Sequence, residues 1–75
     1  MMMTPLNFVE AGKSVKIIKI AAGRGLTQRL SDMGLLEGEI VRVVNNMGGP
    51  LIITKNTSRL ALGRGMGAKI LVEEI

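Results

Sequence analysis

Apolar and polar residues alternate along most of this chain, and a period of two residues is typical of half-buried β-strands. The alternation recurs in five short stretches, which cover residues 14–22, 39–45, 51–55, 59–63 and 69–75. In the second and third stretches it places Val41 with Val43, and Leu51 with Ile53, on single faces. Turn-forming residues separate the stretches, so the pattern predicts five strands joined mostly by tight turns.

The first stretch changes parity part-way along its length. Val15 and Ile17 share one face, whereas Ile18 and Ile20 share the other. One extra residue in a strand has this effect, because a β-bulge moves every following side chain to the opposite face. We therefore expect a bulge near Ile17 and Ile18, which would bend the strand as a small barrel requires.

Between the first and second stretches the apolar period lengthens to that of a helix. Leu26, Leu30 and Met33 recur at i, i+4 and i+7, so they form one apolar stripe. Gly34 follows at the point where helices commonly end in a left-handed residue. That conformation costs about 1 to 2 kcal/mol for a residue with a β-carbon and little for glycine. The sequence predicts a short helix that stops at a sharp corner.

Three glycines are predicted to be structural turns. Gly34 ends the helix, Gly38 turns the chain into the next strand, and Gly63 opens the run GRGMG. That run lacks the Gly-Lys-Ser/Thr ending and the strand-to-helix context of a phosphate-binding loop. Its glycines are interpreted as turning a bent strand. The cluster NMGGP predicts a hairpin with Met47 near its tip.

Five strands and one inserted helix predict an all-β fold with one short helix, namely a small, strongly bent five-stranded barrel. The helix follows the first strand and can plug one end of the barrel. At 75 residues the chain is a single domain, 1–75. Residues 1–12 are expected to form an N-terminal cap, in which Leu6, Phe8 and Val9 fold under the rest.

The composition excludes most catalytic and metal chemistry. The chain has neither cysteine nor histidine, so no thiolate or imidazole can act as nucleophile, base or metal ligand. The six acidic residues include the close pairs Glu37 with Glu39 and Glu73 with Glu74, which are interpreted as solvated surface charge. We predict no catalytic residue, no metal site and no cofactor.

Charge and hydropathy bear on location and partners. Ten lysines and arginines against six acids give a formal charge of +4, with no run of like charge. This indicates either a solvated basic surface or attraction to an acidic partner. The apolar stretches are shorter than a membrane span, and the start lacks the features of a signal peptide. A soluble, cytoplasmic protein is therefore expected.

The order of these signals resembles that of the ferrous iron transport protein A (FeoA) family. The resemblance rests on the following matches: Arg29 with Leu30, MGL at 33–35, Gly38, Val41 with Val43, ALGR at 61–64 and the ILV near the end. The opening PLNFVEAGK is also similar, whereas Gly67 stands where the family more often has alanine.

The resemblance implies an SH3-like barrel that acts as a cytoplasmic accessory protein of bacterial ferrous iron uptake. Its implied partner is the cytosolic GTP-binding part of the membrane transporter FeoB. The chain would reach the membrane only through that partner, and no small-molecule substrate is implied.

Candidate partner-binding residues are those that the barrel does not need. The outer helix face supplies Arg24, Gln28 and Arg29, the corner supplies Leu36, and the hairpin tip supplies Met47. An exposed apolar residue flanked by arginine is common in binding hot spots.

Two alternative functions stay open. One is a small basic barrel that binds nucleic acid, although the aromatic platforms that stack bases are missing. The other is a detached SH3-like domain of a metal-dependent repressor.

Overall fold

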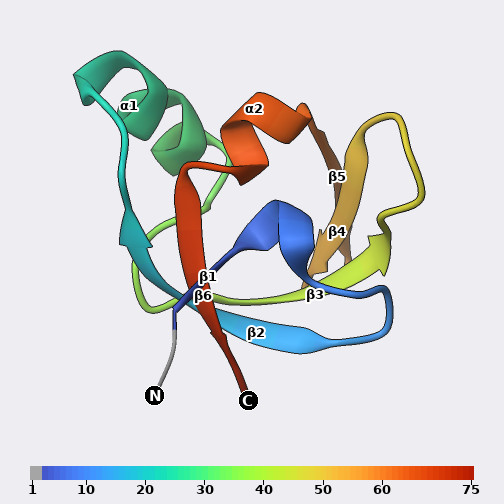
Figure 1. The fold of residues 1–75 in the computed structure, drawn as a ribbon. Helices are drawn as coiled ribbons and strands as arrows, with labels where there is room; N and C mark the ends of the chain where they lie inside the picture. Colours follow the sequence, from blue (N-terminus) through green and yellow to red (C-terminus); the bar gives the residue numbers. More distant parts are fainter. Residues whose placement is uncertain (1–2) are drawn as a thin grey trace.

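The computed structural model describes residues 3–75 and contains six strands, two α-helices and one 3₁₀ helix (Figure 1). In chain order they are β1 (Thr4–Pro5), η1 (Leu6–Phe8), β2 (Ser14–Ile20), α1 (Arg24–Asp32), β3 (Ile40–Asn45), β4 (Leu51–Lys55), β5 (Ser58–Leu62), α2 (Arg64–Gly67) and β6 (Ile70–Glu74).

The strands form one antiparallel sheet in the order β1-β6-β2-β3-β4-β5. The sheet curls around the core, and α1 and α2 lie over the same end of it (Figure 1). The mostly-β fold with a helix after the first long strand is confirmed. The number of strands is six rather than five, because Thr4 and Pro5 pair with Val72 and Leu71 in the segment expected to be only a cap. Two residues are too few to show a periodicity.

The predicted bulge in the first long strand is confirmed. The register between β2 and β6 shifts between Ile17 and Lys19. Val15 and Ile17 therefore point into the core, whereas Ile18 and Ile20 are only partly buried. The shift lets one strand turn along the curled sheet without breaking its pairing.

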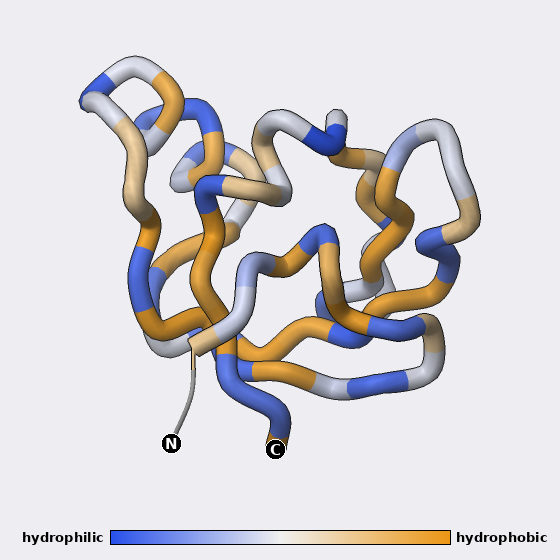
Figure 2. Tube along the Cα trace, in the orientation of Figure 1, coloured by the Kyte–Doolittle hydropathy of each residue, from blue (hydrophilic) through white to orange (hydrophobic). Residues whose placement is uncertain are grey.

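The core is entirely aliphatic, and Figure 2 shows its apolar positions recurring along the strands. Among residues 3–75 no polar or charged residue is buried. The buried hydrophobic residues are Leu6, Val9, Val15, Ile17, Leu30, Leu35, Val41, Val43, Leu51, Ile53, Leu62, Ile70 and Val72. They include the faces predicted for the second and third stretches.

The corner after α1 is a Schellman motif, in which a left-handed glycine closes the helix. Gly34 has φ of +83°, its N–H donates to Ser31 O at 2.9 Å, and the N–H of Leu35 donates to Leu30 O at 2.8 Å. Leu30 and Leu35 are both fully buried. The corner thus satisfies the last helical carbonyls and delivers a second leucine to the core.

Two expectations for local structure are wrong. The run GRGMG does not turn a bent strand: residues Arg64–Gly67 form the helix α2, and Gly63 is its N-cap at φ −63°. Gly67 lies buried in that helix, where an added Cβ would sit 3.2 Å from Asn7 Cβ and from Leu51 Cδ2. A side chain at this position would require Asn7 or Leu51 to shift by a few tenths of an ångström. Phe8, expected to fold under the barrel, is 72% exposed, because η1 turns it outward while Leu6 points in.

Candidate partner-binding surfaces

The outer face of α1 carries the three polar residues predicted to bind a partner. Arg24 begins the helix, and Gln28 and Arg29 follow about one turn later; all three are exposed. The inner face holds Leu26 and Leu30 against the core. Gln28 Nε2 donates to Asp32 Oδ1 at 2.9 Å. Neither arginine forms a salt bridge within residues 3–75, so both guanidinium groups are available.

The two leucines that follow Gly34 differ in their exposure to solvent. Leu35 is fully buried, whereas Leu36 is 46% exposed. Leu36 follows the end of α1 at which Arg29 lies, and Ile40, at the start of β3, is also exposed. The corner therefore carries an exposed leucine, Leu36, directly after a buried one, Leu35, and close to the end of α1.

The loop that carries Leu36 is tied down at both sides. Lys55 Nζ donates to Gly34 O at 2.7 Å and pairs with Glu39 Oε1 at 2.8 Å. The N–H of Gly38, at φ +95°, donates to Ile17 O at 2.7 Å. These contacts join the loop to β2 and β4, so Leu36 is presented in a fixed position, which lowers the entropy lost on binding.

Met47 lies elsewhere. It is 88% exposed at the tip of the β3–β4 connection and borders a shallow hollow together with Phe8, Glu10 and Asn46. Asn46 Nδ2 holds this region together by donating to Asn7 O at 2.9 Å and to Val9 O at 2.7 Å. No residue of α1 is among the described residues that border the hollow. Met47 thus belongs with Phe8, on a different surface from α1 and Leu36.

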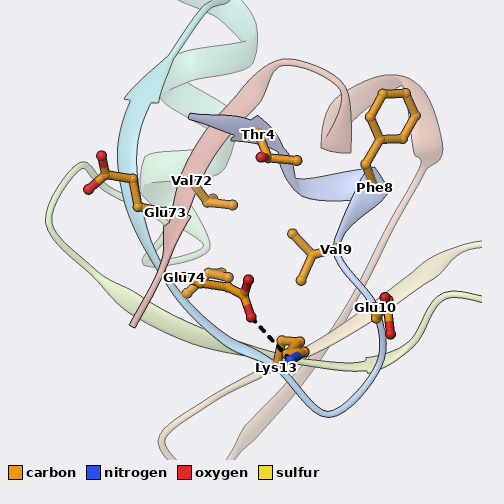
Figure 3. A pocket seen from close by; sticks show the side chains of 9 residues that line it. Thr4, Phe8, Val9, Glu10, Lys13, Val72, Glu73 and Glu74 are labelled. Atoms are coloured by element: carbon orange, nitrogen blue, oxygen red, sulfur yellow. Dashed lines mark ion pairs between the residues drawn. The ribbon is translucent and has the colours of Figure 1, made fainter. Parts of the chain in front are cut away.

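Next to that hollow lies a groove of about 400 Å³ that the sequence did not indicate (Figure 3). Val9 and Val72 form its floor and Phe8 stands at its rim, while Glu73 points away from it (Figure 3). Lys13 Nζ pairs with Glu74 Oε1 at 3.3 Å across the groove. Phe8 is the only aromatic residue of the chain, which was the one available signal.

The described residues offer little to a metal ion. Within 3–75 no three acidic, histidine or cysteine side chains come together in a way that could hold one. In the same part of the chain no helix is both long and apolar enough to cross a membrane.

Comparison with known proteins agrees with the arrangement of helix, corner and barrel. The FeoA domain family matches residues 4–74. The chain belongs to the FeoA family. A protein of Methanocaldococcus jannaschii, provisionally named Fe(2+) transport protein A, is 44% identical over 72 residues, covering 96% of this chain and 88% of that protein. The FeoA family is associated with ferrous iron transport.

Solved structures place the fold in the same family. The crystal structure of an iron uptake regulatory protein, FeoA, superposes with a TM-score of 0.91 at 31% identity, with all of both chains covered. The SH3-like fold expected of a FeoA protein is thus confirmed. A manganese-dependent transcriptional repressor in complex with manganese also superposes, with a TM-score of 0.90 at 16% identity. That match covers 97% of this chain but 37% of the repressor, and it shows the fold alone.

Proposed function

We propose that this FeoA protein is a cytoplasmic adaptor of ferrous iron uptake that binds the cytosolic GTP-binding part of the transporter FeoB and modulates it. The contact surface is the helix face of Arg24, Gln28 and Arg29, with Leu36 as an apolar anchor. The proposal needs no catalytic residue, cofactor or metal ion of its own. The chain reaches the membrane through its partner.

The observation that carries the proposal is the exposed Leu36, in a loop held by hydrogen bonds just after the helix end at which Arg29 lies. An aliphatic side chain at 46% exposure is hydrated in the free protein, so its burial in an interface is favourable. Because Lys55 and Gly38 hold the loop, binding does not have to order it first. The arginines add long-range attraction to an acidic surface.

The test is a titration of the purified FeoB cytosolic domain, with and without GTP, across a range of salt concentrations. Arg24→Glu should weaken binding mainly by slowing association, and the effect should shrink as salt rises past about 0.15 M, where charges are screened beyond roughly 8 Å. Leu36→Ala should instead speed dissociation. Arg42→Glu, which makes the same charge change at an exposed position of β3, is the matched control.

Random RNA in the same titration tests the nucleic-acid alternative. RNA binding would show an affinity whose logarithm falls linearly with the logarithm of salt concentration. Micromolar RNA binding near physiological salt, with no binding of the transporter domain in either nucleotide state, would overturn the adaptor proposal.

A further inference from the structure

The last strand of the sheet, β5, has one unpaired edge. The sheet begins with β1 and ends with β5, which lies beyond β4 (Figure 1). Within residues 3–75 β5 pairs with β4 alone, from Leu51 opposite Leu62 to Lys55 opposite Ser58. Its other edge has no neighbouring strand.

The register shows which backbone groups face that edge. The hairpin turns through Asn56 and Thr57, so Lys55 and Ser58 are the hydrogen-bonded pair that closes it. Bonded and non-bonded pairs then alternate along an antiparallel ladder. Arg59 and Ala61 fall at non-bonded positions, and their N–H and C=O groups therefore point away from β4.

These groups have no other partner in the described part of the chain. No hydrogen bond outside the β4–β5 ladder reaches the backbone of Arg59 or Ala61, and both residues are exposed. Two N–H donors and two C=O acceptors thus stand in a row on an accessible strand. Such a row is a template for an additional strand.

The surroundings of this edge are basic. The three strands at this end of the sheet, β3, β4 and β5, contain no acidic residue and hold Arg42, Lys55 and Arg59. Glu39 neutralises Lys55. Arg42 on β3 and Arg59 on β5 both lie opposite Thr54, so the two arginines stand on the outer face about 10 Å apart.

We propose that the β5 edge binds an extended acidic segment of another protein, which adds a strand to the sheet and places an acidic side chain opposite Arg59. The backbone groups of Arg59 and Ala61 supply the hydrogen bonds, and Arg59 selects the charge. A second copy of β5 is a poor occupant, because two stretches without acids would meet and repel. The site is separate from the α1 surface and does not depend on its proposed role.

The test uses a short synthetic peptide in which every second residue is valine and the residues between are glutamate or threonine. NMR of the labelled full chain should show slowed amide exchange and shifted resonances at Arg59 and Ala61. A matched peptide with lysine in place of glutamate should bind roughly tenfold more weakly, since an attractive cross-strand pair becomes repulsive. Arg59→Glu should reverse this preference.

Two further variants separate backbone from charge effects. Lys16→Glu makes the same charge change on β2, three strands away, and should keep the preference for the glutamate peptide. Ala61→Pro removes one free N–H and should lower affinity several-fold, while the fold persists because proline is tolerated where the N–H faces away from the sheet.

Three results would overturn the proposal. They are unchanged exchange at Arg59 and Ala61 with every peptide, equal affinity for the two peptides, or protection of these amides through self-association in the absence of peptide. The first would leave Arg59 as a residue that only discourages strand pairing.

Discussion

At the residue scale, Gly34 is required for two reasons that act together. Its φ of +83° is strained for any residue with a β-carbon. An added Cβ would also lie 2.8 Å from Lys55 Nζ, which donates to the carbonyl of the same glycine. The sequence indicated the first reason, whereas the second depends on β4 and could be seen only in the folded chain.

Gly34→Ala should therefore lower the free energy of unfolding by about 2 to 3 kcal/mol, the sum of backbone strain and a lost hydrogen bond. Gly25→Ala is the matched control, because Gly25 lies in α1 with open space around its Cα, and it should stabilise by up to about 1 kcal/mol. Urea unfolding measures both. In a Lys55→Met background the cost of Gly34→Ala should fall to the strain alone, and an unchanged cost would rule out the lysine contact.

At the element scale, α1 and its corner serve both the core and the surface. Leu30 and Leu35 are fully buried, while Leu36 and the arginines of the helix are exposed. The Schellman motif fixes where the helix stops, and so decides which leucine enters the core. Neighbouring residues of one corner thus contribute to the core and to the exposed surface.

Leu30→Ala should cost about 2 to 5 kcal/mol of unfolding free energy, because it removes a buried side chain from a close-packed core. Leu36→Ala should change stability by less than about 0.5 kcal/mol, as exposed substitutions usually do. Thermal or urea unfolding of the two variants gives the comparison. Similar losses for both would mean that Leu36 is part of the core and unavailable as an anchor.

At the scale of the whole molecule, the exposed apolar side chains and the arginines are distributed over three separate surfaces. Leu36 lies beside α1, Phe8 and Met47 lie around the hollow next to the groove, and Arg59 lies at the free edge of β5. The carboxylates are dispersed among these surfaces, and no cluster of ligands suited to a metal ion occurs within residues 3–75.

Fe(II) added at micromolar concentration under anaerobic conditions should leave the melting temperature unchanged, because carboxylates that are not clustered and have no other ligand type beside them bind this ion weakly. A ligand present at about 100 times its Kd would stabilise the fold by ~2.7 kcal/mol, a rise of roughly 10 °C or more for a domain of this size. A calorimetric scan detects such a rise easily. A saturable increase would show that this chain binds iron directly.

The sequence by itself determined the strands after residue 12, the inward faces of β3 and β4, the bulge in β2 and the left-handed stop at Gly34. These follow from local rules, since side-chain parity and the conformational freedom of glycine act within a few residues. The resemblance to the FeoA family rested on the same corner together with matches along the rest of the chain, such as ALGR at 61–64 and the ILV near the end.

The tertiary structure alone decided which surfaces are exposed to solvent. Phe8 points outward because η1 turns it away from the core. The run GRGMG is helical because α2 packs against η1, so closely that an added Cβ at Gly67 would come within 3.2 Å of Asn7 and Leu51. Met47 is separated from Arg24, and β5 is left with a free edge, because sheet order is set by pairing between strands that are distant in sequence. Exposure depends on every segment that packs nearby, so no local pattern could specify it.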